Sequence, residues 1–233
     1  MLIFYYITPH AVKQSKTRYN TNRNFNQITP FDITYLIMYN TGMNTPSEDT
    51  ITLSRASEKD CARIYALLEE AFDKSERRDY ADFIRAAKYA DYIMFDIMRA
   101  DTVVGFIGAW TCDDILYIEH LATYAQYRNM GYGATALKLL QTDYPAIVLE
   151  IEPPETDLQK RRRGFYERLG FVMNDCEYLQ PPFRADDAPF PLKLMSYPIA
   201  LSDAQPVVRE IYEKVYNTDF QTVIEKYKKS RKQ

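Results

Sequence analysis

Six residues, Arg128-Asn129-Met130-Gly131-Tyr132-Gly133, stand between an apolar strand-like run and an amphipathic helical run. Two glycines at such a turn let the backbone approach a bulky anion closely and leave several N–H groups free to bind it. The positive end of the following helix adds to this attraction. The spacing lacks the third glycine of a dinucleotide fingerprint and the Gly-Lys-Ser/Thr of a P-loop. On these residues alone the segment is either an ordinary turn or a phosphate-binding loop of another kind.

A second segment, Phe165-Tyr166-Glu167-Arg168-Leu169-Gly170-Phe171, follows after an apolar strand at 146–151. Together with Arg128-x-x-Gly131-x-Gly133, it closely resembles the GNAT superfamily of acetyl-CoA-dependent N-acetyltransferases, over roughly residues 50 to 200. The resemblance implies that acetyl-CoA is the co-substrate and that a free amine attacks its thioester directly. It also implies that the strands at 115–122 and 146–151 separate and leave a cleft for pantetheine.

The implied cofactor contacts fall on two stretches of the chain. The CoA diphosphate would bind the N–H groups of a short run, with the side chain of Arg128 adding charge. That run is Asn129, Met130, Gly131, Tyr132, Gly133 and Ala134. The pantetheine would lie like an extra strand beside Leu121, Ala122 and Thr123.

Three residues are candidates for proton transfer. Tyr166 matches the family's tyrosine and is the candidate acid for the departing thiolate; the alternative is a core aromatic. Glu119 is the first choice for the base, because a carboxylate in an apolar strand is costly unless it lines a cleft or is paired. His120, expected on the opposite side of the pleat, is the second choice, and a water relay stays open.

Three further charged residues are candidates for binding the substrate. Glu150 and Glu152 alternate with apolar residues and would point to one face, either as a solvated strand end or as a negative wall that attracts a cationic amine. Arg163 lies one turn before Tyr166 in the run Lys160-Arg161-Arg162-Arg163, which is either a solvated face or a contact for phosphate or carboxylate. At position 159 the family often has Asn, whereas this chain has Gln159.

The order of elements predicts a mixed α/β sheet, mostly antiparallel, with helices on both faces. Strands are expected at 50–55, 92–98, 103–111, 115–122, 146–151, 171–176 and 192–197. Helices are expected after Ser57, around 83–89, at 132–142, from a cap at Asp157 to Leu169 with Gly170 closing the turn, and from 203 to about 228. Residues 1–48 are interpreted as a disordered or mis-called extension with Met43 a plausible start, 49–200 as the transferase domain, and 201–233 as a helical segment packing on it.

Composition limits the partners. The chain has 233 residues, 46% of them hydrophobic, and a formal net charge of −3, which does not favour nucleic acid. Three scattered cysteines and the lack of a signal-like or membrane-length apolar run indicate a cytoplasmic protein without a membrane partner or a metal. The expected partner is a small-molecule or peptide amine, and a homodimer stays open. The alternatives are an acyl-CoA-binding regulatory module without turnover, another acyl donor, or an oxygen acceptor.

Overall fold

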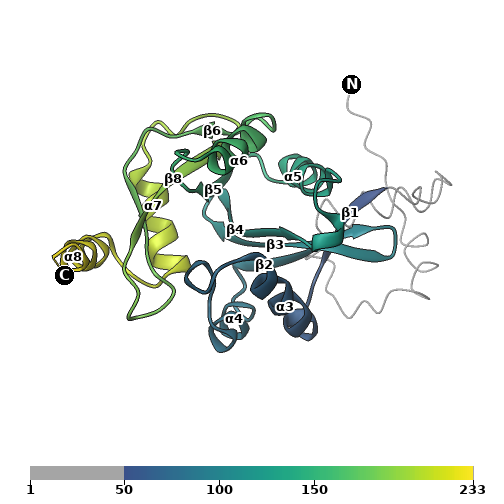
Figure 1. Ribbon diagram of the computed structural model, residues 1–233, viewed down its shortest axis with the longest axis horizontal. Coiled ribbons are helices and arrows are strands. Elements are labelled where there is room, and N and C mark those ends of the chain that lie inside the picture. Colours follow the sequence, from purple (N-terminus) through teal and green to yellow (C-terminus); the bar gives the residue numbers. More distant parts are fainter. Residues whose placement is uncertain (1–49, 233) are drawn as a thin grey trace, which may run out of the picture. The chain divides into compact units, whose positions relative to one another are not determined.

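The computed structural model describes residues 50–232. The predicted extension at 1–48, including Met43, therefore lies outside the described residues. Within them, eight strands build one mixed sheet in the order β1-β2-β3-β4-β5-β8-β6, with β7 paired to β8 (Figure 1). Neighbouring strands are antiparallel except for the parallel pair β4 and β5. The predicted fold class, a mixed and mostly antiparallel sheet, is confirmed. The strands are β1 (Ile51–Arg55), β2 (Tyr92–Arg99), β3 (Thr102–Cys112), β4 (Ile115–Thr123), β5 (Ile147–Ile151), β6 (Val172–Met173), β7 (Tyr178–Gln180) and β8 (Phe190–Tyr197).

Helices cover both faces of the sheet. In Figure 1, α3 and α4 lie on one side of it, and α5 and α6 lie on the other. The α-helices are α3 (Cys61–Ala71), α4 (Tyr80–Ala86), α5 (Tyr132–Asp143), α6 (Asp157–Glu167), α7 (Gln205–Glu210) and α8 (Phe220–Ser230). Short 3-10 turns occur at Glu58–Asp60, Lys74–Glu76 and Ala125–Tyr127.

The helix starts follow local chemistry. Ser57 and Asp60 form a capping box at the 3-10 turn that leads into α3. In α6 the N-cap is Thr156 and not Asp157 as predicted, because the Thr156 side chain accepts from the Gln159 backbone N–H while the Gln159 side chain accepts from the Thr156 N–H. Gly170 has φ +84° and reverses the chain after α6, as expected.

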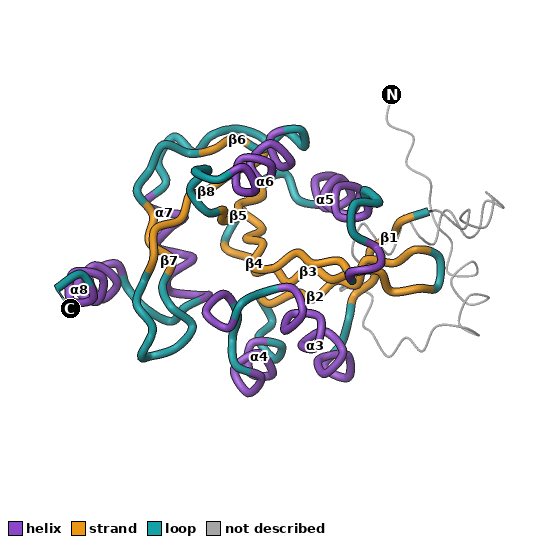
Figure 2. The backbone as a smooth tube through the Cα atoms, in the orientation of Figure 1, coloured by secondary structure: helices purple, strands orange, loops and turns teal. Residues whose placement is uncertain are grey.

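The single C-terminal helix predicted from 203 to 228 is wrong. The chain forms α7, continues as a π-helix (Ile211–Val215), and breaks at Asn217, whose φ is +49°. Asp219 then caps α8 by accepting from the Thr222 backbone N–H. Figure 2 shows the loop that separates the two helical pieces. The helix ends here because Asn217 is left-handed and Asp219 begins a new helix, although the apolar spacing continues through both.

The main hydrophobic cluster lies on the face of the sheet that α3 and α4 cover. Ile64 and Phe83 from these helices pack with Phe106 and Trp110 of β3, and the C-terminal segment contributes Tyr212. The predicted strand at 171–176 shrinks to two residues in β6, and β7 was not predicted. Both are short pieces that pair with β8.

Candidate active site

The strands β4 and β5 pair over only three residues and then separate. Their ladder joins Leu116 to Ile147, Tyr117 to Val148, and Ile118 to Leu149, and ends there. The separation predicted between these strands is therefore present. The first residues after the last pair are Glu119 on β4 and Glu150 on β5.

The loop ahead of α5 presents free backbone amides. Gly131 has φ +80° and Asn129 has φ +63°, both left-handed. The first helical hydrogen bond of α5 runs from the Thr135 N–H to the Gly131 carbonyl, at 3.0 Å. Among the described residues, no acceptor binds the backbone N–H groups from Asn129 to Ala134. Six consecutive amides at a helix start make a site for an anion.

A groove with a volume of about 430 Å³ opens beside these amides. Leu121 and Thr123 of β4 form one wall, and Phe165 of α6 another. Ala122, between them, is buried in the main hydrophobic cluster on the other face of the sheet. Its predicted contact with the cofactor is therefore limited to the backbone. The remaining lining residues are Tyr127, Asn129, Gly131, Tyr132, Gly133 and Ala134.

Two residues of the predicted loop point elsewhere. The Arg128 guanidinium lies 3.2 Å from the Glu70 carboxylate and 3.4 Å from the Thr123 carbonyl oxygen. The pair with Glu70 is exposed on both sides, so it contributes little to stability and is free to open. The side chain of Met130 is exposed.

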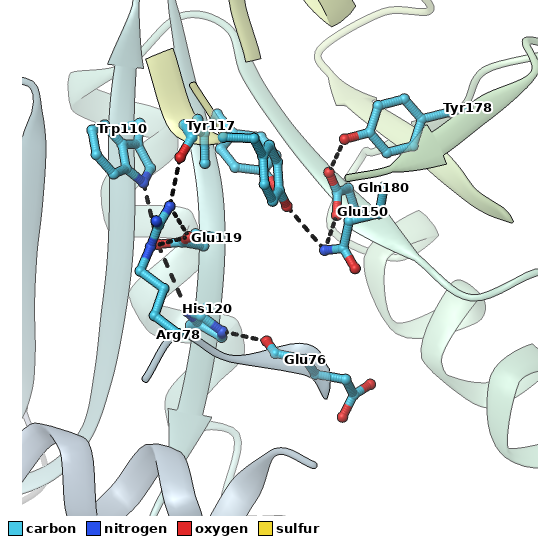
Figure 3. A network of polar contacts seen from close by, with 11 residues as sticks. Glu76, Arg78, Trp110, Tyr117, Glu119, His120, Glu150, Tyr178 and Gln180 are labelled. Carbon is cyan, nitrogen blue, oxygen red and sulfur yellow. Dashed lines mark hydrogen bonds and ion pairs between the residues drawn. The ribbon is translucent and has the colours of Figure 1, made fainter. Parts of the chain in front are cut away.

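Glu119 is tied to a buried arginine. Its Oε1 lies 2.9 Å from Arg78 Nη2, and its Oε2 accepts from Trp110 Nε1 at 3.2 Å (Figure 3). The side chain of Glu119 is only 2% exposed and that of Arg78 is 15% exposed. Arg78 also donates to the Val215 carbonyl at 2.7 Å. The cost of burying this carboxylate is offset by a partner cation, the second of the two situations foreseen from the sequence.

His120 lies on the same side of the sheet as Glu119, and the prediction that it faces the other side is wrong. A β-bulge is the reason: His120 pairs with Gly108 and Ile118 pairs with Ala109, so Glu119 is the extra residue. His120 Nε2 lies 2.9 Å from the Glu76 carbonyl, which makes Nε2 the donor. Burial lowers the pKa of His120, so the ring is neutral at pH 7.

Glu150 is bound by neutral donors. Its Oε1 accepts from the Tyr178 hydroxyl, and its Oε2 accepts from Gln180 Nε2 at 2.7 Å (Figure 3). Burial raises the pKa of Glu150 to about 7; the Tyr178 and Gln180 hydrogen bonds lower it, and the nearby Glu119 raises it.

The other two predicted substrate-binding residues are engaged on α6. Glu152 lies past the end of β5 and pairs with Arg162 at 2.6 Å. It does not share the Glu150 cluster, so the two carboxylates do not form one negative wall. Arg163 pairs with Glu167 of its own helix at 2.7 Å.

Tyr166 packs between two aromatic rings. Its centroid lies 5.0 Å from that of Phe165, which lines the groove, and 5.8 Å from that of Phe171. Burial raises the pKa of Tyr166, and the nearby Arg162 lowers it less. Its phenol therefore stays protonated at pH 7 and is able to donate a hydrogen bond.

Several residues of the polar cluster around Glu119 and Glu150 were not predicted. Arg78 comes from the loop ahead of α4, Tyr178 and Gln180 from β7, and Tyr216 from the break after the π-helix. The Tyr216 hydroxyl accepts from Gln180 at 3.0 Å and lies 3.3 Å from the Tyr117 hydroxyl. The only local signal was the alternation of Tyr178 and Gln180 ahead of two prolines, which is typical of a short edge strand.

Comparison with known proteins gives the class of the enzyme. Residues 61–171 match the model of the acetyltransferase (GNAT) family. A solved structure from Bacteroides thetaiotaomicron, described as a GNAT-family acetyltransferase, is 29% identical, with a TM-score of 0.67 over 72% of this chain and 99% of that one. Residues 61–171 therefore form an acetyltransferase domain of the GNAT family, and the protein is an acetyltransferase. Acetyltransferases of this family use acetyl-CoA.

More distant structures include the ribosomal-protein-S18-alanine N-acetyltransferase of Escherichia coli, at 17% identity over 66% of this chain and 97% of that one. Another is Arabidopsis thaliana NAA60 with acetyl-CoA, at 15% identity over 64% and 98%. Each has a TM-score of 0.48. No curated protein matches the chain. In residues 50–232, no helix is both long and apolar enough to cross a bilayer.

Proposed function

We propose that the protein transfers the acetyl group of acetyl-CoA to a primary amine of a small molecule or peptide, by direct attack of the amine on the thioester. The run of unpaired amides from Asn129 to Ala134, open to the groove beside β4, is the observation that supports this most strongly. A diphosphate needs several converging donors, and this loop offers them at the positive end of α5.

The groove residues suggest how the cofactor would lie. The diphosphate would bind the loop amides, with Arg128 exchanging its exposed partner Glu70 for phosphate. The pantetheine would run past Leu121 and Thr123, where β4 has lost its neighbour β5 and has backbone groups free for an added strand.

Tyr166 is proposed as the acid for the leaving thiolate. Its ring contacts Phe165 at the groove wall, and its phenol is protonated at neutral pH. The proton acceptor for the amine would come from the groups at the separation of β4 and β5, where Glu119, His120 and Glu150 lie. A base at this point would face an amine that enters from the side of the sheet opposite α5.

Two measurements test the function. Calorimetric titration with acetyl-CoA should show saturable binding, and release of the CoA thiol should occur with at least one member of a panel of primary amines. Binding without thiol release from any acceptor would favour an acyl-CoA-binding regulatory module instead. The absence of binding would remove the phosphate-loop interpretation altogether.

A further inference from the structure

Glu119 and Glu150 are adjacent carboxylates with opposite surroundings. Glu119 forms an ion pair with the Arg78 guanidinium, and its second oxygen accepts from Trp110 Nε1. Glu150 has no cation within ion-pair distance among the described residues; it is held by the Tyr178 hydroxyl and the Gln180 amide, which are neutral. Of the two carboxylates at the separation of the strands, Glu150 is therefore the one without a paired cation.

We propose that Glu150, and not the arginine-bound Glu119, is the residue that takes the proton from the acceptor ammonium group. This rests on the proposed acetyl transfer. The carboxylate of Glu150 removes one proton from the bound ammonium and leaves a neutral amine. The nitrogen lone pair then attacks the thioester carbonyl carbon, and the carbon–sulfur bond breaks. The sulfur takes up a proton as CoA–SH, the product nitrogen loses its second proton, and Glu150 returns its own proton to solvent.

The groups around Glu150 that donate hydrogen bonds to it are neutral side chains, which suits it to exchange a proton. Burial raises the pKa of the surrounding tyrosines well above 10, so their hydroxyls stay donors at neutral pH. A carboxyl that titrates near neutrality changes its protonation state at the least cost in each turnover. The titratable and polar groups that face Glu150 are Tyr117 and Glu119 of β4, Tyr178 and Gln180 of β7, and Tyr212 and Tyr216 of the C-terminal segment.

The polar groups around Glu150 extend away from the sheet. Gln180 Nε2 donates both to Glu150 Oε2, at 2.7 Å, and to the Tyr216 hydroxyl, at 3.0 Å. Tyr216 lines a second cavity, of about 220 Å³, together with Phe183 and residues of α8 such as Lys226. A chain of hydrogen bonds therefore links the buried carboxyl with a cavity at the surface.

The first test compares Glu150→Gln with wild type in the full chain, after the amine panel has identified an acceptor. The variant should lose about 10²- to 10⁴-fold in kcat/KM while its affinity for acetyl-CoA stays within about twofold of wild type. Glu177→Gln removes an exposed carboxylate beside Tyr178 and is the matched control, expected to keep full activity. Full activity in Glu150→Gln would overturn the proposal, and a wild type that releases no CoA thiol would overturn the proposed function instead.

The second test separates a catalytic role from a structural one. Tyr178→Phe removes a hydrogen bond that lowers the pKa of Glu150, so the acidic limb of the kcat/KM profile should move to higher pH. A purely structural Glu150 predicts a lower rate with the limb unmoved. An unmoved limb in a folded Tyr178→Phe variant would also overturn the proposal.

Discussion

Arg78 Nη2 lies 2.9 Å from Glu119 Oε1 inside the protein, where the arginine also donates to the Val215 carbonyl. The guanidinium stands over the rings of Trp110 and Phe183, 5.5 and 5.0 Å from their centroids. This ion pair joins β4 to the loop ahead of α4 and to the C-terminal segment.

Glu119→Gln should destabilise the fold strongly. It leaves the Arg78 charge buried without its partner, a loss of about 3–5 kcal/mol. Arg78→Met should cost a similar amount, and the double variant should cost clearly less than the sum of the two. Urea unfolding of the four proteins measures this coupling, and additive effects would show that the pair contributes nothing.

Gly131→Ala should weaken acetyl-CoA binding. Gly131 has φ +80°, so an alanine there costs about 1–2 kcal/mol of backbone strain, although its added methyl would meet nothing within 4 Å in the free protein. The strain should alter the direction of the loop amides. Isothermal titration calorimetry measures the loss of affinity.

Gly164→Ala is the control for this loop variant, because its methyl would meet only the flexible end of the Arg168 side chain, at 3.3 Å. Its affinity for acetyl-CoA should equal that of wild type. Equal affinities for wild type, Gly131→Ala and Gly164→Ala would contradict the assignment of the loop.

Tyr166→Phe should lower kcat about 10- to 100-fold with little change in acetyl-CoA affinity, since phenylalanine keeps the ring contacts with Phe165 and Phe171. Steady-state kinetics with thiol detection measures it. Unchanged turnover would remove Tyr166 from the proton transfer to the thiolate.

Glu150 should make wild-type stability fall with pH relative to Glu150→Gln. Its pKa is about 7 in the folded chain and 4.5 for an unperturbed glutamate side chain, so below 4.5 it is protonated in both states. As pH rises from 4.5 to 7 the unfolded chain releases the proton first, which favours unfolding by up to about 3 kcal/mol. Urea unfolding at pH 4.5 and 8 compares the two proteins. A constant difference between them would contradict the raised pKa.

The glycine turn ahead of α5 was predictable because its determinants are contiguous. An apolar run, a glycine turn and a helical period follow one another within residues 115–142, and each is visible from local spacing. The same holds for the β2–β3 hairpin, which turns at Ala100 with φ +47°. The loop assignment to acetyl-CoA came from resemblance and stays a proposal.

The acidic cluster was only partly predictable. Glu119 and Glu150 stand out as charges in apolar strands, but their different surroundings depend on Arg78 and Tyr178, which are 41 and 28 positions away. The bulge that turns His120 to the side of Glu119 is set by pairing with β3, which strict alternation along β4 does not reveal.

The early end of the β4–β5 ladder has a consequence for solvent exchange. Past Ile118, no strand within residues 50–232 lies beside β4 on the side away from β3 to accept hydrogen bonds from its amides. In deuterated buffer these positions should label quickly in the empty enzyme and slowly once a cofactor lies along them. Hydrogen exchange at the unpaired end of β4 therefore shows whether the cofactor is bound.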